Sequence, residues 1–396
     1  MSGLFITGIG HLTTNVDDQI LDAVVTIDEG TVTYAGGASD APDQGERERM
    51  DVSGDAVIPG FVDAHTHLVF AGDRSDEFAR RLAGESYRDI AAAGGGILST
   101  VEATRSASEE TLFELAAKRV WTMIRGGTTS IEIKSGYGLD LETELRLLRV
   151  ARRIGEELPV TVRTTFLGAH SVPPEYRSDR DGYIELVVNE MLPAVADLAD
   201  FCDVFIEDGV FSVDEARTIF EASNALGLPA RVHAEQLSHL GGATLAAEIG
   251  AASADHLDHV TPHDASALAD AGVTCVLVPG AAYTLGTPQP SGRLLWDAGC
   301  TVALATDCNP GTSYMETMGL VISLGVVQMS LTVDEAIWAA TRGGALSLGL
   351  EDRGQIKTGA PADLVVLGAP APAHIPYRPA SNLTRTVIKE GSVVTG

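Results

Sequence analysis

Two histidines, His65 and His67, stand two residues apart in the segment 59–67, which reads Pro-Gly-Phe-Val-Asp-Ala-His-Thr-His. Side chains two positions apart on a β-strand face the same side, so an extended segment would present both imidazoles together. Two imidazoles on one side can share a single metal ion. The spacing alone also fits two histidines that are hydrogen-bonded by neighbouring groups, so further donors must decide between these interpretations.

Three more polar side chains stand in or directly after later β-type runs. His233 lies in the run 230–234, His256 lies in the run 253–259, and Asp307 directly follows the run 302–306. Active sites of (β/α)8 barrels lie at the carboxyl ends of the strands, where such side chains meet. Imidazoles and a carboxylate suit a borderline divalent ion such as Zn²⁺ or Fe²⁺, and water bound to such an ion becomes a nucleophile near neutral pH. We therefore predict a catalytic metal site.

The middle of the chain alternates between short β-branched runs and helical stretches. Repeated strand–helix alternation predicts a parallel sheet, and eight such units in about 300 residues favour a closed (β/α)8 barrel. The competing fold, an open doubly wound sheet, usually carries a glycine-rich turn after its first strand, whereas the first run here ends in His-Thr-His. The eight runs are 57–63, 128–133, 160–167, 202–207, 230–234, 253–259, 274–278 and 302–306, and the helical stretches include 109–125, 141–157, 213–226 and 264–271.

Both ends of the chain read as β-structure, with short extended runs separated by turns. These runs are 3–9, 23–27 and 30–35 before the barrel, and 362–367 and 385–392 after it. We expect the two ends to pair into one small β-sandwich beside the barrel; two unrelated terminal extensions are the alternative. The predicted parts are 1–58, 59–355 and 356–396. The long connection 72–96 after the first run is a candidate lid, and Tyr87 within it is a candidate substrate contact.

Composition restricts the partners of this protein. The chain has 396 residues and a formal net charge of −28, which opposes binding to nucleic acid and to acidic membrane surfaces. Its apolar stretches fall short of the roughly 20 residues that a transmembrane helix needs, and the first residues lack the features of a signal peptide. The four cysteines are scattered without a Cys-x-x-Cys pair, as is typical of a reducing compartment. We therefore expect a cytoplasmic protein without nucleic-acid or membrane partners.

The histidine pair of the first run and the aspartate after the eighth resemble the amidohydrolase superfamily, whose barrels open with His-x-His and close with Asp. The resemblance implies a metal-dependent hydrolase with a β-sandwich built from both termini. Superfamily members with two metal ions carry a carboxylated Lys on strand four, but the run 202–207 contains no Lys. Lys134, in the second run, is expected to form an ordinary ion pair or hydrogen bond. The resemblance therefore implies one zinc or iron ion (Zn²⁺, or Fe²⁺/Fe³⁺) bound by His65, His67, His233 and Asp307.

Further segments resemble one branch of this superfamily over essentially the whole chain. The most specific are Lys-Ser-Gly-Tyr-Gly at 134–138 and Leu-Gly-Ala-His at 167–170. Members of that branch open a cyclic amide C–N bond of 4-imidazolone-5-propanoate, which gives N-formimidoyl-L-glutamate, and they are commonly homodimers. The alternatives are another mononuclear amidohydrolase or deaminase acting on a cyclic amide or amidine, and a metal-free barrel that only binds ligands. The matching segments are 69–74, 93–97, 132–139, 166–170, 233–236 and 306–311.

The same resemblance implies roles for residues around the metal. The expected substrate is a small molecule with a carboxylate tail. A strongly acidic protein needs a local cation to bind such a tail, and Arg74 can bind a carboxylate through two N–H groups. Tyr137 and His170 can donate hydrogen bonds to the substrate. Asp307 is expected to activate the attacking water together with the metal, and His256 to hydrogen-bond to the developing oxyanion or to that water. Further contacts are expected from Asn309, Gly311 and Thr312.

One position departs from the pattern of the superfamily. Some members, and related deaminases, carry Glu three residues after the strand-five histidine, where it transfers the proton, but this chain has Gln236. A glutamine amide does not titrate and can only orient a ring or a water molecule. Glu235 is adjacent, but on a strand its side chain is expected to face the other side. We therefore assign Gln236 to substrate binding, and proton transfer to Asp307 and His256.

Overall fold

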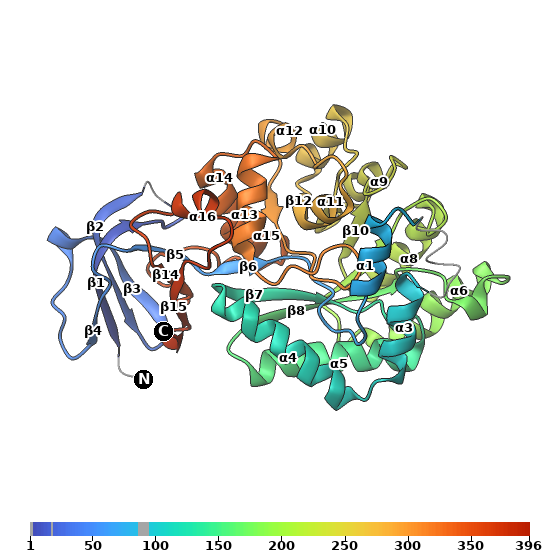
Figure 1. Ribbon diagram of the computed structural model, residues 1–396, viewed down its shortest axis with the longest axis horizontal. Helices are drawn as coiled ribbons and strands as arrows, with labels where there is room; N and C mark the ends of the chain where they lie inside the picture. The colour runs from blue at the N-terminus through green and yellow to red at the C-terminus, as the bar shows by residue number, and fades with distance from the viewer. Residues whose placement is uncertain (1–2, 17–18, 86–94) are drawn as a thin grey trace.

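The computed structural model describes residues 3–16, 19–85 and 95–396, and these residues form two eight-stranded sheets. Figure 1 shows a small β-structure on the left, which contains both ends of the chain, and a larger body of strands and helices on the right. The larger body is the predicted parallel barrel, and the smaller one joins the two termini as expected. The predicted fold class is therefore confirmed.

The barrel strands pair with one another in sequence order, and all are parallel. Each of the eight predicted runs overlaps one of them. The strands are β6 (Phe61–Asp63), β7 (Thr128–Lys134), β8 (Thr161–Ala169), β9 (Phe201–Phe205), β10 (Ala230–Ala234), β11 (Ser253–His256), β12 (Thr274–Leu277) and β13 (Val302–Leu304).

The first and last barrel strands meet just beyond their carboxyl ends. The backbone amide of Asp307 donates to the carbonyl of His65, and the amide of His67 donates to the carbonyl of Cys308, each at 3.0 Å. These bonds close the barrel on the side of the predicted site. They also bring the histidine pair next to an aspartate more than two hundred residues away in the chain.

Helices follow the strands and surround the barrel (Figure 1). The predicted stretches 109–125 and 141–157 coincide with α4 and α5. In α5, the Asp140 side chain caps the first turn by accepting from the Thr143 amide at 2.8 Å, and apolar residues such as Leu147 and Ile154 are buried. The helices are α1 (Ser75–Leu82), α3 (Ile97–Ser106), α4 (Glu109–Arg125), α5 (Leu141–Glu157), α6 (Arg180–Leu186), α7 (Leu192–Val195), α8 (Val213–Ala225), α9 (Gly242–Ile249), α10 (Pro262–Ala271), α11 (Pro279–Leu285), α12 (Gly292–Asp297), α13 (Met318–Val327), α14 (Val333–Trp338), α15 (Gly344–Ser347) and α16 (His374–Tyr377).

The smaller sheet joins strands from both ends of the chain. Strand β5 pairs in parallel with β1 and antiparallel with β14, so the N-terminal and C-terminal parts share one hydrogen-bonded sheet. Apolar side chains from both parts, including Ile6, Val25 and Leu364, bury one another in a single core. The strands are β1 (Leu4–Leu12), β2 (Ile20–Asp28), β3 (Thr31–Gly37), β4 (Glu48–Asp51), β5 (Ala56–Pro59), β14 (Leu364–Leu367), β15 (Thr384–Lys389) and β16 (Ser392–Thr395).

The predicted run 57–63 is two strands rather than one, and this part of the prediction is wrong. Val57 and Ile58 belong to β5 in the small sheet, whereas Phe61 begins β6 in the barrel. The chain passes between the sheets at Gly60, where a Cβ atom would lie 2.3 Å from the Thr129 side chain. Only glycine permits this close approach, so a continuous apolar run in the sequence conceals a change of sheet.

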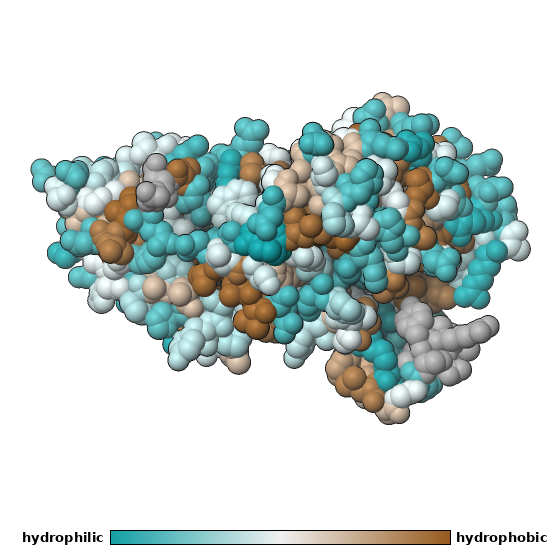
Figure 2. All heavy atoms as spheres, turned by 90° about the horizontal axis from the view of Figure 1, so that it is seen from above, coloured by the Kyte–Doolittle hydropathy of each residue, from teal (hydrophilic) through white to brown (hydrophobic). Residues whose placement is uncertain are grey.

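Seen from above, the surface is mostly hydrophilic, with small apolar areas interspersed (Figure 2). Among the helices of the described residues, none is both long and apolar enough to cross a membrane.

Candidate metal centre and active site

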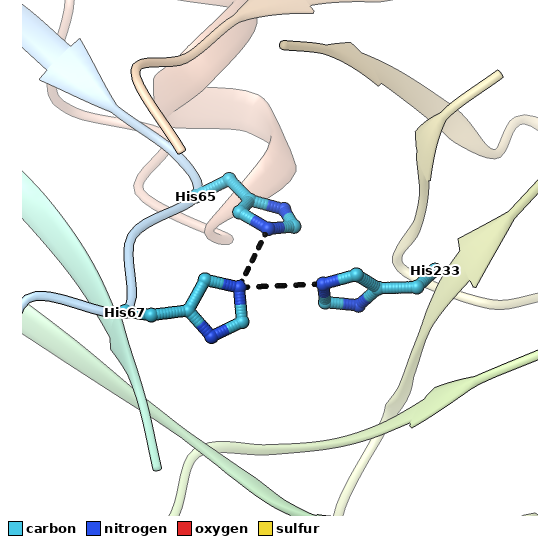
Figure 3. A group of neighbouring side chains, drawn as sticks. All are labelled: His65, His67 and His233. Carbon is cyan, nitrogen blue, oxygen red and sulfur yellow. Dashed lines mark hydrogen bonds between the residues drawn. The ribbon is translucent and has the colours of Figure 1, made fainter. Parts of the chain in front are cut away.

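His65 and His67 follow β6 directly, and both side chains are buried at the carboxyl end of the barrel. Their rings turn toward one another, and the two Nε2 atoms are 3.2 Å apart (Figure 3). His233, in β10, approaches from across the barrel and brings its Nε2 atom to 3.4 Å from Nε2 of His67. The structure therefore brings the three predicted imidazoles together.

Asp307 completes a group of four donors. Its Oδ1 atom lies 3.5 Å from Nε2 of His65 and 3.6 Å from Nε2 of His67. Donors placed at about 2.0–2.1 Å around a tetrahedral Zn²⁺ ion are separated by about 3.3 Å, which is close to the distances seen here. His65, His67 and Asp307 thus have the chemistry and the spacing of ligands to one metal ion, and His233 joins them through its contact with His67.

Two buried carboxylates set the orientation of the imidazoles. Nδ1 of His65 lies 2.7 Å from Oδ2 of Asp255, and Nδ1 of His233 lies 2.9 Å from Oδ2 of Asp203. A carboxylate accepts a proton-bearing nitrogen, so His65 carries its hydrogen on Nδ1 and turns an Nε2 lone pair toward the centre. The nearby Asp203 carboxylate favours the same tautomer in His233 through its charge. Converging lone pairs repel one another unless a cation lies between them, which supports a metal site rather than a self-contained hydrogen-bonded cluster.

His256 lies at the edge of the same centre. One of its ring nitrogens is within 4.8 Å of ligand atoms of His65 and Asp307, and its ring centroid is 5.1 Å from that of His233. Its buried Nδ1 atom has no hydrogen-bond partner among the described residues. The residue has a positive φ of 77°, which turns the end of β11 away from regular strand geometry. His256 is thus placed to contact a substrate or a water in the centre.

Burial determines the charge state of these groups. It lowers the pKa of His65, His67 and His256 well below the usual imidazole value, and neighbouring imidazoles add to this effect. The neutral imidazole is the form that binds metal ions. Burial also raises the pKa of the Asp307 carboxyl well above its usual range, and a bound cation would oppose this by favouring the carboxylate.

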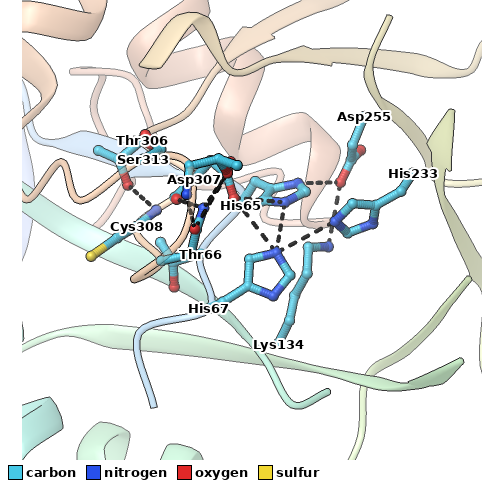
Figure 4. Close-up of polar contacts among 12 residues, drawn as sticks. His65, Thr66, His67, Lys134, His233, Asp255, Thr306, Asp307, Cys308 and Ser313 are labelled. Carbon is cyan, nitrogen blue, oxygen red and sulfur yellow. Dashed lines mark hydrogen bonds and ion pairs between the residues drawn. The ribbon is translucent and has the colours of Figure 1, made fainter. Parts of the chain in front are cut away.

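A buried charged network lies next to the histidines, and Figure 4 shows two of its members, Lys134 and Asp255, beside His65 and His233. The Lys134 ammonium group is 2.8 Å from Asp203, 2.9 Å from Glu132 and 3.3 Å from Asp255. Burial alone would lower the pKa of Lys134, but the surrounding carboxylates raise it overall. Lys134 therefore forms ion pairs, as its position in the second run indicated.

Sequence reasoning missed the carboxylates of this network. Asp203 lies in the fourth run and Asp255 directly precedes His256, and both are completely buried. Their signal in the sequence is an acidic residue inside an apolar β-type run. Such a residue requires a buried partner, but its sequence position does not identify that partner.

Tyr137 and His170 form one wall beside the metal centre. The His170 ring stacks on His67 with centroids 5.1 Å apart and an interplanar angle of 18°, and the Tyr137 ring lies 5.4 Å from His170. Nδ1 of His170 lies 3.0 Å from the carbonyl oxygen of Gly136, to which it donates in that tautomer. Burial lowers the pKa of His170 to about 3, so this ring is neutral and its Nε2 atom is left for a ligand.

Arg74 lies next to Gly311, although the two residues are far apart in the chain. Its Nε atom donates to Glu77 at 3.0 Å, and its Nη1 atom lies 2.5 Å from the place where a Cβ atom on Gly311 would be. The Asn309 side chain holds the turn that contains Gly311, because its Oδ1 atom accepts from the amides of Gly311 and Thr312, both at 2.8 Å. The structure thus brings the predicted cation next to the predicted 309–312 contacts.

Gln236 and Glu235 lie in the bend after β10 and differ in their surroundings. Glu235 has a φ of 55°, and its carboxylate accepts from the backbone amides of Leu240, Gly241 and Ala243 at the start of α9. It therefore stabilises a helix end. Gln236 is half-buried in the same bend. Tyr87 and much of the predicted lid lie outside the described residues.

Comparison with known proteins shows the family of this chain. Residues 56–394 match the family model described as Amidohydrolase family. The imidazolonepropionase of Haloarcula marismortui is 50% identical over 381 residues, which cover 94% of this chain and 90% of the relative. The imidazolonepropionase of Mycolicibacterium smegmatis is 46% identical over 403 residues, with coverage of 100% and 98%.

Solved structures show the same fold at low sequence identity. The N-isopropylammelide isopropylaminohydrolase of Burkholderia multivorans has a TM-score of 0.73 at 20% identity and covers 100% of this chain and 98% of its own. The 5-methylcytosine deaminase of Klebsiella pneumoniae has a TM-score of 0.75 at 18% identity, with coverage of 98% and 97%. These similarities establish the architecture, whereas the choice of reaction depends on the closer relatives and on the site.

Proposed function

The chain belongs to the amidohydrolase family, and we propose that it hydrolyses 4-imidazolone-5-propanoate to N-formimidoyl-L-glutamate, as expected of an imidazolonepropionase. One observation carries the proposal: successive contacts of 3.2–3.6 Å connect the donor atoms of His233, His67, His65 and Asp307 at the barrel mouth, within a chain that matches imidazolonepropionases over nearly its whole length. The enzyme is thus a hydrolase of a cyclic amide C–N bond.

We propose that these four residues hold one ion per subunit, either Zn²⁺ or iron. Three neutral imidazoles and a carboxylate accept both metals. When bound, such an ion lowers the pKa of water and polarises a carbonyl group.

The protein residues then carry the proton and stabilise charge. Asp307 accepts a proton from the attacking water, whose oxygen bonds to the ring carbonyl carbon. His256 donates a hydrogen bond to the carbonyl oxygen as negative charge develops there. The C–N bond breaks, and Asp307 returns the proton to the leaving ring nitrogen. The ring opens to a carboxylate and a formimidoyl-bearing nitrogen.

The remaining predicted residues position the substrate. Arg74 binds the propionate through its guanidinium group, which lies against Gly311. Tyr137 donates to the substrate from the wall beside His67, and His170 contacts it through Nε2, which accepts a hydrogen bond while Nδ1 donates to Gly136. The ring is oriented by the Gln236 amide, and the 309–312 turn adds contacts from Asn309, Gly311 and Thr312.

The test is a product assay on the purified protein. The protein, with and without a chelator, receives imidazolonepropanoate freshly generated from urocanate, and mass spectrometry follows formimidoylglutamate above the uncatalysed background. We expect product that disappears with the chelator and returns on adding Zn²⁺ or Fe²⁺. Release of ammonia with an intact ring would instead support a deaminase. A metal-loaded protein without either activity would refute the assignment of imidazolonepropanoate as the substrate.

We also propose that the chain forms a homodimer in the cytoplasm, without nucleic-acid or membrane partners. The net charge of −28 and the hydrophilic surface support the absence of those partners. Light scattering coupled to size-exclusion chromatography tests the dimer, since a mass near 41.4 kDa would refute it.

A further inference from the structure

Lys134 is one of only four lysines in the chain, and it is buried where the proposed reaction needs no lysine. Its ammonium group lies beneath the histidines among carboxylates, in contact with Asp203 and Asp255 (Figure 4). A buried ion pair has to overcome the loss of hydration of both charges, so it is weak evidence for added stability. Its position under the metal centre suggests another role.

The contacts of Lys134 connect it to two metal ligands through single oxygen atoms. Oδ2 of Asp203 is 2.8 Å from Nζ of Lys134 and 2.9 Å from Nδ1 of His233. Oδ2 of Asp255 is 3.3 Å from the same Nζ and 2.7 Å from Nδ1 of His65. One ammonium group therefore holds both of the oxygen atoms that orient two of the three imidazoles.

We propose that Lys134 is a positioning residue of the metal centre, which sets metal affinity by holding Asp203 and Asp255 against the ring nitrogens of His233 and His65. This inference rests on the metal site of the proposed function. It goes beyond that function because the ammonium group of Lys134 contacts carboxylates outside the proposed ligand set, those of Glu132, Asp203 and Asp255.

Charge explains why a lysine is needed at this place. Asp203 and Asp255 are both completely buried, and without a shared cation the two carboxylates repel each other. Arg231 also reaches Asp255, at 3.4 Å, but its guanidinium group mainly donates to the carbonyls of Ala64 and Ser347. Within the described part of the chain, Lys134 is the only lysine or arginine that forms an ion pair with Asp203.

The backbone of Lys134 has a separate role that substitution preserves. Its amide donates at 2.9 Å to the carbonyl of Thr66, the residue between the two histidines. A change of the side chain leaves this bond in place. Variants of Lys134 therefore test the ammonium group rather than the path of the 65–67 segment.

The experiment measures metal affinity in Lys134→Met. Co²⁺ is titrated into the metal-free protein and followed by its visible absorption, with a chelator of known affinity as competitor. Loss of groups that orient metal ligands typically lowers metal affinity by about 10–100-fold, and we expect a loss in this range with an altered Co²⁺ spectrum. A folded Lys134→Met protein with wild-type affinity and spectrum would overturn the proposal.

Lys389→Met is the matched control. Lys389 is the other buried lysine of the described chain, with Nζ 3.0 Å from Asp363. It also contacts Thr161 at the amino end of β8, which is the end of the barrel opposite to the site. We expect this variant to lose thermal stability but to bind Co²⁺ as the wild type does. Equal losses of affinity in both variants would reduce the role of Lys134 to general stability and overturn the proposal.

If Lys134→Met does not fold, a second variant can still contradict the proposal. In Lys134→Gln, the amide retains two N–H donors for the carboxylates but carries no charge, so the main change is the loss of the cation. We expect weaker Co²⁺ binding here as well, and wild-type affinity would contradict the proposal. A wild-type protein that binds no metal would refute both this inference and the proposed function. A wild type that binds Co²⁺ but leaves the imidazolone intact would refute the function alone, and the variants would still decide the role of Lys134.

Discussion

Replacing Arg74 by Met removes the proposed cation for the carboxylate tail while it retains most of the aliphatic side chain. The Arg74 side chain is only 12% exposed, and its Nε atom is occupied by Glu77 at 3.0 Å. The terminal Nη atoms are therefore the groups that can bind a carboxylate. One of them lies against Gly311, on the turn that is expected to contact the substrate. Methionine offers no donor at this place.

The expected loss follows from the strength of charged hydrogen bonds. A hydrogen bond to a charged group contributes about 1.5–3 kcal/mol, and each 1.4 kcal/mol corresponds to a factor of ten. Arg74→Met is therefore expected to lower kcat/KM by about 10–150-fold. The carboxylate tail is not the reacting group, so the change is expected mainly in KM.

The assay compares two substrates in the wild type and in Arg74→Met. With imidazolonepropanoate, the variant loses activity as stated, whereas with the corresponding propionamide the wild type and the variant become similar, because no carboxylate remains to be bound. Arg80→Met, in the helix α1 that begins directly after Arg74, removes an exposed guanidinium group that pairs with Glu85, and it is expected to leave KM unchanged. An unchanged KM in Arg74→Met, or an equal loss with both substrates, would refute the assignment of Arg74.

Three further changes give distinct results. Gly311→Ala introduces a Cβ atom 2.5 Å from Nη1 of Arg74, the movable end of a side chain, so KM is expected to rise in steady-state assays with little change in Tm. Asp307→Ala is expected to lower kcat by orders of magnitude while circular dichroism shows an intact fold, and near-wild-type turnover would contradict the metal centre. His239 pairs with Asp264 at 2.9 Å, and this pairing raises the pKa of His239. The pair therefore stabilises the fold fully below pH about 6.5, and this stabilisation is lost as the pH rises through the pKa of His239 in the folded state. Urea unfolding of His239→Ala should therefore give a lower free energy of unfolding than the wild type at pH 5.5, and the difference should disappear at pH 9. We expect a difference below about 1 kcal/mol because the ring is half-exposed. An equal difference at both pH values would show that the charge of His239 is not involved.

Much of the fold could be predicted because it depends on local patterns. The alternation of β-branched runs with helical stretches identified the eight barrel strands, and the stretch 141–157 coincides with α5, which the Asp140 side chain caps. The exception, the run 57–63, failed because an apolar run is identical whether it belongs to one sheet or to two. The division at Gly60 depends on Thr129, a residue in the neighbouring strand.

The candidate ligands could also be recognised before the structure. His65, His67 and Asp307 stand at strand ends, and the carboxyl ends of barrel strands meet on one face. The expectation for Glu235 likewise agrees with its place at the start of α9. The reason differs from the one expected from the sequence: Glu235 is not on the strand, because its positive φ ends β10 before it, and so the alternation of side chains along a strand does not decide its direction.

Residue types and their periodicity thus determine the barrel, the face on which the site lies and the kind of chemistry that its side chains offer. The partners of those side chains are a different matter. His65 meets Asp255 across 190 positions of chain, and Lys134 meets Asp203 across 69. Such contacts depend on how neighbouring strands are aligned when the barrel closes. Because that alignment follows from the packing of the whole barrel, only the tertiary structure reveals which buried carboxylate orients which histidine and which cation holds both carboxylates in place.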